Sequence, residues 1–190
     1  MAQTEIHKYT VQERLGKMDV DIIDITATLS GADGETAAEG QVMFLPTEIP
    51  NCVSVNGGTS LLHSVVAIVA DHATDTGSNG VDCLSGFRCV FTSQSSITNL
   101  ALHDVVATEG TASGSGGFTV SRAELAGTCG VVPIAGASDM GYFGVHYASN
   151  CGSVLKAASD STSLYVWGIS SDDSDYNSAT ITLRIGVIKD

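Results

Sequence analysis

The closing stretch, residues 163–190, contains the densest group of potential metal ligands in the chain. Asp172, Asp173 and Asp175 stand close together there, and calcium binds clustered carboxylate oxygens. The loop lacks the central Gly and the distal Glu of an EF-hand loop, so we expect a solvated hairpin tip between two strands. The sequence therefore predicts no metal and no cofactor, and a calcium site in this loop is the alternative.

The histidines do not form a recognisable metal or catalytic pattern. No HxH or HExxH pair occurs, so a zinc site would have to be assembled from distant loops. His63 and His146 stand in apolar runs, and we expect them to be core or interface residues with satisfied nitrogens. The five histidines are His7, His63, His72, His103 and His146.

Nucleophile and phosphate-binding motifs are also missing from the sequence. Ser115 stands in ASGSGG, where Ser113 occupies the position of the first Gly of a G-x-S-x-G elbow. The GSGG run also lacks the glycine spacing of the known phosphate-binding loops. We therefore predict no catalytic residues and no enzymatic activity, and keep a hydrolase as a third class of function.

The cysteines are odd in number and include no C-x-x-C spacing. We expect them to be small buried hydrophobic residues with reduced thiols. Cys83 and Cys89 are close enough in sequence to bridge across a hairpin, which is the alternative. The five cysteines are Cys52, Cys83, Cys89, Cys129 and Cys151.

The charge distribution limits the partners of the chain. The net charge is −13, and only eight residues are Lys or Arg. Binding to nucleic acid or to an anionic membrane needs clustered cations, so we expect neither. Three of the cations, Lys8, Arg14 and Lys17, lie in the first 17 residues, where docking onto an acidic partner is plausible.

Short strand-like runs separated by turn residues fill most of the chain. Residues 20–29 form the first run, and residues 40–46 form a second that Pro46 should end. Residues 60–72 are the most apolar segment and predict a central strand buried on both faces. Residues 87–93 should pair with that strand through a long connection.

The middle of the chain is less regular. Residues 97–107 suit either a strand or a helical turn, and residues 108–118 predict a flexible Gly/Ser loop. Residues 119–127 predict a short helix, because Ser121 and Glu124 form a capping box. The whole pattern predicts an all-β antiparallel β-sandwich, jelly-roll-like, with an N-terminal arm. The arm spans residues 1–20, and residues 21–190 form a single β-sandwich domain.

The two strands of the closing stretch differ in their faces. The last one alternates, so its apolar residues should all face the core. They are Ile181, Leu183, Ile185 and Val187. The preceding run has Leu164 and Val166 on one face, but its other face is apolar too. A loop or a neighbouring subunit must cover that second face, which makes it the candidate subunit interface. It consists of Tyr165, Trp167 and Ile169.

Four segments, taken in order, resemble a family of small virion proteins in tailed phages. They are GGTSLLHSVVAIV, FRCVFTS, TVSRAELAGTCGVVPI and SLYVWGIS…ATITLRIGVIKD, and the resemblance covers residues 57–190. The acidic loops and the cysteines depart from the family pattern. The residues that carry the resemblance are Gly57, Gly58, Leu61, Leu164, Tyr165, Leu183, Ile185, Gly186 and Asp190.

The resemblance implies a capsid decoration, or cement, protein without enzymatic activity. Such a protein would bind and stabilise the capsid lattice as a homotrimer, with the major capsid protein as its partner. The arm with Lys8, Arg14 and Lys17 is then the candidate capsid-docking segment. We expect synthesis in the host cytoplasm and a final location on the capsid surface. The alternative is a tail, fibre or lectin-like module that binds a receptor or glycan through residues 73–86 and 108–118.

Overall fold

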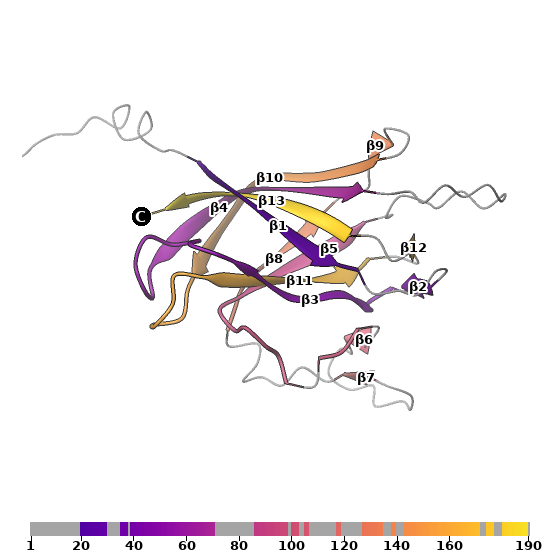
Figure 1. Cartoon of the computed structure of the whole chain (residues 1–190), viewed down its shortest axis with the longest axis horizontal. Helices are drawn as coiled ribbons and strands as arrows, with labels where there is room; N and C mark the ends of the chain where they lie inside the picture. Colours follow the sequence, from indigo (N-terminus) through magenta and orange to yellow (C-terminus); the bar gives the residue numbers. More distant parts are fainter. Residues whose placement is uncertain are drawn as a thin grey trace, which may run out of the picture.

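The computed structural model of the chain contains two antiparallel sheets that pack face to face (Figure 1). The structure describes residues 20–29, 35–37, 39–70, 86–98, 100–102, 105–106, 117–118, 127–134, 138–139, 143–171, 174–176 and 180–189. These residues contain strands, turns and irregular segments but no helix, so none of them could span a membrane as a helix. The expected all-β antiparallel sandwich is confirmed.

The larger sheet has five strands and the smaller has four. The larger sheet has the order β1-β13-β4-β10-β9, with bounds Asp21–Thr28, Thr180–Lys189, Thr59–Ala70, Phe143–Lys156 and Ser138–Asp139. The smaller has the order β3-β11-β5-β8, with bounds Val42–Ile49, Leu164–Ser170, Phe87–Thr92 and Thr128–Ile134. Two small pairs complete the fold: β2 (Glu35–Ala37) with β12 (Ser174–Tyr176), and β6 (Val105–Val106) with β7 (Gly117–Phe118).

The long strands pair as nested partners, from the two ends of the chain toward its middle. β1 pairs with β13, β3 with β11, β4 with β10 and β5 with β8, and every pair is antiparallel. Two further pairings, β13 with β4 and β11 with β5, join these partners into the two sheets. The last strand therefore lies inside a sheet, between β1 and β4, rather than at an edge.

The space between the sheets is filled by apolar side chains from every long strand. The alternation predicted for the last strand is confirmed, because its four apolar residues are fully buried. On the smaller sheet, Gly168 lies beneath the ring of Phe44, and an added Cβ would overlap that ring. Phe44 in turn meets Phe87 edge to face, with ring centroids 6.5 Å apart. The four core residues of β13 are Ile181, Leu183, Ile185 and Val187.

β4 is a central strand, as expected, but its two faces are not equally buried. Leu62, Val65 and Ala67 face the core, whereas the residues between them are only half-buried. His63 is skipped in the register with β13, where Gly186 pairs with Ser64 and Val187 pairs with Leu62. Because of this bulge, the residues that face the core have even numbers before His63 and odd numbers after it. The run therefore has apolar residues at both kinds of position, although only one face of the strand is buried.

Two expected pairings are wrong. β5 does not pair with β4; it lies in the other sheet between β11 and β8. β11 and β13 do not form a hairpin either, because they belong to different sheets and the connection between them crosses the edge of the sandwich. Alternation identifies the inward face of a strand but carries no information about its neighbour, which is why the segments were found and their partners were not.

One strand boundary also differs from the expectation. β3 continues through Pro46 to Ile49, since β3 is an edge strand where a missing N–H costs no ladder bond. The register with β11 shifts at this proline, from Thr47 opposite Val166 to Phe44 opposite Gly168. Residues 143–156 form the single strand β10, with an irregularity between Ser149 and Ser153.

Several expectations fall outside the described residues. The N-terminal arm with Lys8, Arg14 and Lys17 is among them, as are the predicted helix at 119–127 and most of the Gly/Ser loop. Residues 97–98 and 100–102 are described and are irregular, with a turn. In the acidic loop, Asp172 and Asp173 are not described, and Ser174–Tyr176 is strand β12 paired with β2 rather than an open hairpin tip.

Candidate functional site

The outer face of the smaller sheet is covered by the chain itself. Trp167 is only 2% exposed and packs with Val42 and Val90 from the neighbouring strands. Ile97 is buried in the same cluster, and Leu100 packs against it. The N–H of Leu100 donates to the carbonyl of Ile97 at 3.1 Å, and this turn brings both side chains onto the sheet. The sequence left open whether a loop or a neighbouring subunit covers this face, and in the structure a loop covers it.

The three residues of the candidate subunit interface therefore lie in different surroundings. Trp167 and Ile169 belong to the covered cluster, so they offer little surface to a neighbouring subunit. Tyr165 lies at the other end of β11, opposite Thr92 and Glu48, and is half-buried. A subunit bound on this side would contact the covering loop and Tyr165 rather than Trp167.

The outer face of the larger sheet has apolar residues and no such cover among the described residues. Tyr147 is 63% exposed, Val154 61% and Ile22 56%, although each lies within a regular strand. Tyr147 stands opposite Val66 on β4, and Val154 opposite Leu61. Exposed apolar residues that adjoin across strands form a surface of the kind that binds protein. We call the group of Ile22, Leu61, Val66, Tyr147 and Val154 the open face.

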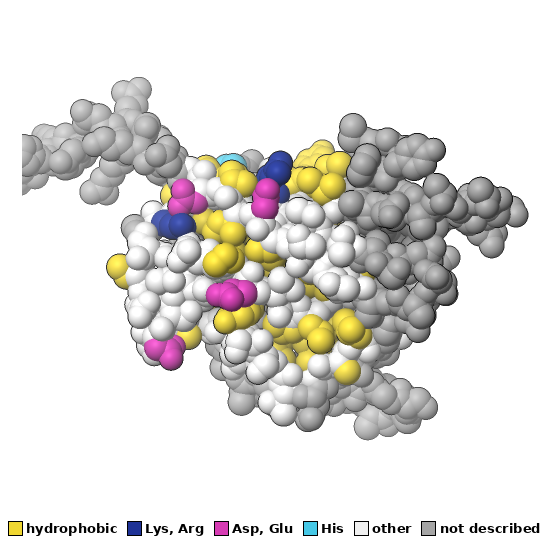
Figure 2. All heavy atoms as spheres, in the orientation of Figure 1, with side chains coloured by type: hydrophobic (Ala, Val, Ile, Leu, Met, Phe, Trp, Pro, Cys, Tyr) yellow, Lys and Arg dark blue, Asp and Glu magenta, His cyan; other side chains and the backbone are white. Residues whose placement is uncertain are grey.

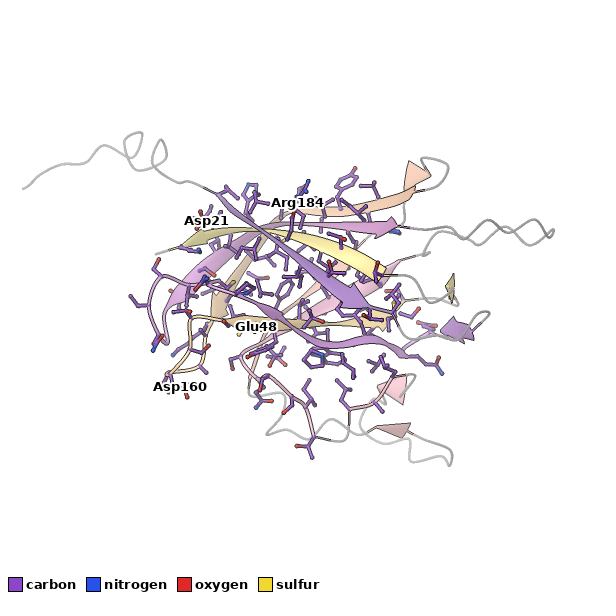
Figure 3. All side chains as sticks on the ribbon, in the orientation of Figure 1. Asp21, Glu48, Asp160 and Arg184 are labelled. Atoms are coloured by element: carbon purple, nitrogen blue, oxygen red, sulfur yellow. The ribbon has the colours of Figure 1, made fainter. Side chains whose placement is uncertain are left out.

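Ion pairs neutralise the charges beside the open face. The guanidinium of Arg184 donates to both carboxylate oxygens of Asp24, at 2.9 and 3.0 Å. The ammonium of Lys189 lies 2.8 Å from the carboxylate of Asp21. Figure 3 shows Asp21 and Arg184 along the larger sheet. The hydrogen bond from Arg184 lowers the pKa of Asp24, so this pair remains charged at neutral pH.

The surface as a whole carries few charged side chains. Figure 2 shows hydrophobic patches lying between uncharged polar atoms over the described part of one side of the molecule. Charged residues make up 15% of the chain, against roughly 25% in ordinary soluble domains. Depletion of charge is typical of surfaces buried in protein interfaces.

A polar depression of about 510 Å³ lies at one end of the smaller sheet. One wall is the segment that follows β5, and the other is the connection between β10 and β11. Figure 3 shows Asp160 at the tip of that connection and Glu48 on the neighbouring strand β3. The depression is lined by Ser93, Gln94, Ser95, Ser96, Ala158, Asp160, Ser161 and Tyr165.

The described cysteines are free thiols. Cys52 and Cys89 are buried, which confirms the expectation for them, and burial raises the pKa of both. Cys129 and Cys151 are only partly buried, and burial also raises the pKa of Cys151. Cys83 lies outside the described residues. The thiols of Cys52, Cys89 and Cys151, whose pKa is raised, are therefore protonated and weakly nucleophilic at neutral pH.

The two histidines of the apolar runs are both in the larger sheet. His146 is fully buried, as expected, and its ring meets that of Phe87 edge to face at 5.9 Å. His63 is half-buried, and its Nδ1 has no hydrogen-bond partner among the described residues. The expectation of satisfied nitrogens is wrong for Nδ1 of His63 and for Nε2 of His146, neither of which has a hydrogen-bond partner among the described residues.

Comparisons add no family to this description. The sequence matches no protein-family profile, and no curated protein matches it. Within the described ranges, no group of three His, Cys, Asp or Glu side chains is placed to hold a metal ion. The candidate functional sites are therefore surfaces: the open face for protein, and the polar depression for a small molecule.

Sequence reasoning missed both surfaces. The open face was hidden because the apolar residues of β4 were assigned to burial on both sides. The depression joins residues 93–96 to residues 158–165, which are far apart in the chain and come together through the pairing of β5 with β11. A signal was present in the serine-rich run SQSS, which follows a buried strand without an obvious turn motif.

Proposed function

We propose that the sandwich is a jelly roll. Without the two-residue β9, each sheet has four strands, and the nested order matches a long hairpin rolled up into two layers. The first strand pairs with the last, the second with the second-last, and so on inward. Jelly rolls occur in viral capsid proteins, lectins and cupins, so this strand order agrees with a virion protein and equally with the other two classes.

We propose that the chain is a virion structural protein, a decoration or cement protein that stabilises the capsid lattice as a homotrimer. The open face is the single observation that carries this proposal. Tyr147 and Val154 are large, exposed and framed by the half-buried Val66 and Leu61. The described residues supply no cover for this apolar face, and a cover from another chain explains it best.

The open face is our candidate for the contact between subunits. A stable interface buries about 800 Å² on each partner, which is the scale of a sheet face rather than of a single loop. Three copies of one capsid-binding site would then act together, so that a weak individual contact gives firm attachment. In this proposal the trimer is the unit that binds the lattice.

The N-terminal residues 1–20 are our candidate for the contact with the major capsid protein. This segment holds Lys8, Arg14 and Lys17, three of only eight Lys and Arg residues in a chain whose net charge is −13. Deletion of residues 1–17 should leave a folded trimer that no longer binds capsids. An unfolded or monomeric deletion product would instead assign this segment to the fold or to the subunit contact.

The test is reconstitution on particles of the virus that encodes this chain, after they have been stripped of it. We expect the purified protein to co-sediment with these capsids, to saturate at a copy number that matches positions in the lattice, and to raise their resistance to heat. A protein that does not bind such particles, or that binds without saturation, would refute the proposal.

The polar depression favours a second candidate function, a glycan-binding module of a tail or fibre. That alternative placed its binding surface in residues 73–86 and 108–118, which lie almost entirely outside the described residues. The depression offers a different and described location on the same sandwich.

A further inference from the structure

We propose that the polar depression at the end of the smaller sheet binds a neutral saccharide. This inference goes beyond the proposed virion role, since a decoration protein needs no glycan site. The depression holds about 510 Å³, which lies within the range of roughly 300–1,000 Å³ for small-molecule sites. Most such sites are lined by apolar side chains, but polar side chains predominate in this lining. It therefore suits a ligand that is itself covered with hydroxyl groups.

The lining offers the groups that a saccharide requires. Serine hydroxyls both donate and accept hydrogen bonds, the Gln94 amide does the same, and the Asp160 carboxylate accepts two. Tyr165 adds an aromatic ring with an apolar body and a polar tip, which suits the mixed surface of a sugar ring. Only Ala158 among the lining residues has an aliphatic side chain.

Several of these groups are not engaged within the protein. Among the described residues, the side chains of Gln94, Asp160 and Tyr165 have no hydrogen-bond partner, although all three line one depression. Displacing water from such groups is favourable only for a ligand that restores their hydrogen bonds. A polyol does so, whereas an apolar ligand would leave them unsatisfied.

The backbone around these groups is held in place before any ligand arrives. The N–H of Gln94 donates to Thr92 Oγ1 at 3.2 Å, and an added Cβ at Gly127 would lie 2.9 Å from the Gln94 side chain. On the opposite wall, Ser161 Oγ accepts from the N–H of Ser163 at 2.9 Å. Contacts of this kind lower the entropy lost on binding.

The charge of the lining selects against ionic ligands. None of the described residues that line the depression is Lys or Arg, and the Asp160 carboxylate would repel a sialic acid, a sulfate or a phosphate. A single carboxylate is also too few for a calcium site, which takes six to eight oxygen ligands. A neutral sugar is the class of ligand that remains.

The experiment uses the full-length protein on an array of neutral, sialylated and sulfated glycans, followed by titration with the free neutral sugars that bind. We expect binding of neutral glycans, with dissociation constants of about a millimolar for small sugars, as for a shallow site. Asp160→Asn removes the charged acceptor on an exposed loop and should weaken binding by roughly tenfold or more. Tyr165→Leu should weaken it similarly through loss of the ring.

Two matched variants serve as controls. Tyr147→Leu removes a tyrosine from the other sheet, and Asp21→Asn neutralises a carboxylate on β1 of that sheet, which pairs with the ammonium of Lys189. Both should bind neutral glycans like the unmodified protein. Binding that is absent, restricted to acidic glycans, or weakened equally by the controls would overturn the proposal. Asp160→Asn does not threaten folding, so the proposal stays testable even if Tyr165→Leu fails to fold.

Capsid binding distinguishes this proposal from the virion role. Asp160→Asn and Tyr165→Leu should both bind stripped capsids normally, because the depression lies at the end of the smaller sheet and the open face lies on the larger one. If either variant folds yet loses capsid binding, the depression is a capsid contact and the saccharide proposal is wrong. If neither the variants nor the unmodified protein binds capsids, but neutral glycans bind as expected, only the proposed virion role is wrong.

Discussion

The outer faces of both sheets carry apolar residues, but a loop covers those of the smaller sheet and the described residues leave those of the larger sheet uncovered. On the smaller sheet, Trp167 and Ile169 are buried beneath a loop that contributes Ile97 and Leu100. On the larger sheet, Tyr147 and its neighbours are exposed. The same sequence feature, a strand that is apolar on both faces, thus has two structural outcomes.

The difference shows what an apolar outer face means in a sandwich of this kind. Where the chain supplies its own cover, the residues beneath it belong to a second small core and stabilise folding. Where the described residues supply no cover, the apolar side chains gain nothing from exposure in the free protein, and we propose that a partner subunit covers them. The two faces should therefore respond to mutation in opposite ways, one in folding and the other in assembly.

The largest expected effect is on the covered face. Trp167→Ala should lower the free energy of unfolding by roughly 3–5 kcal/mol, because it removes the centre of the second cluster. That is comparable to Leu183→Ala in the main core, at about 2–5 kcal/mol. Urea denaturation followed by circular dichroism measures both. A Trp167→Ala protein that folds normally but dissociates would show that Trp167 lies in the subunit interface after all.

The contact between Gly168 and Phe44 should rank second. A Cβ at Gly168 would overlap the Phe44 ring, so Gly168→Ala must displace a core aromatic at a cost of about 1–3 kcal/mol. Gly130→Ala on β8 is the matched control, since its Cβ would lie 3.3 Å from the side chain of Ser153, which can move. Equal thermal stability of the two variants would contradict the packing described for β3 and β11.

A smaller effect is expected from the ion pair beside the open face. The hydrogen bond from Arg184 lowers the pKa of Asp24, so the pair stabilises the fold above the ordinary value of 3.8 and the contribution disappears as the pH falls through the lowered pKa. Arg184→Gln should therefore reduce the melting temperature slightly at neutral pH and not at strongly acidic pH. The reduction is small because both side chains are about half exposed. A large loss at neutral pH, or one that persists in acid, would contradict this assignment.

The smallest effect is expected from redox conditions. The described cysteines are free thiols, so reducing agents should leave the melting temperature almost unchanged. Cys83→Ser should give the same result, which excludes an influence of the one cysteine outside the described residues. A disulfide would typically contribute about 2–4 kcal/mol, so a drop of many degrees on reduction would show a bridge that the structure lacks.

The sequence predicted the strands of this fold better than their partners. Alternation in residues 181–187 identified the core face of β13, because a period of two leaves no other choice beside an apolar interior. The pairing of β5 with β11 instead of β4 could not be predicted, since all three runs are apolar and β-branched or aromatic. Nothing in a strand's own pattern names its neighbour.

The candidate sites were harder still to predict. The cover over Trp167 comes from an irregular segment in which only Ile97, Leu100 and Leu102 touch the sheet, and such spacing resembles no regular element. The open face could be predicted only with knowledge of the bulge at His63, because the bulge changes which residues of β4 face the core. The saccharide proposal required the two walls of the depression to meet through long-range pairing. Each depends on contacts between distant segments.

The most direct test of the central claim is to place polar residues on the open face and measure mass in solution. Tyr147→Ser combined with Val154→Ser should leave the melting temperature of the monomer nearly unchanged, because both side chains are exposed. Sedimentation velocity should show a trimer for the unmodified protein and a folded monomer for this variant. Val55→Ser with Leu45→Ser, which changes two exposed apolar residues on β3 of the smaller sheet and in the loop that follows it, should remain trimeric. An unmodified protein that is monomeric at all concentrations, or a double open-face variant that stays trimeric, would contradict the account.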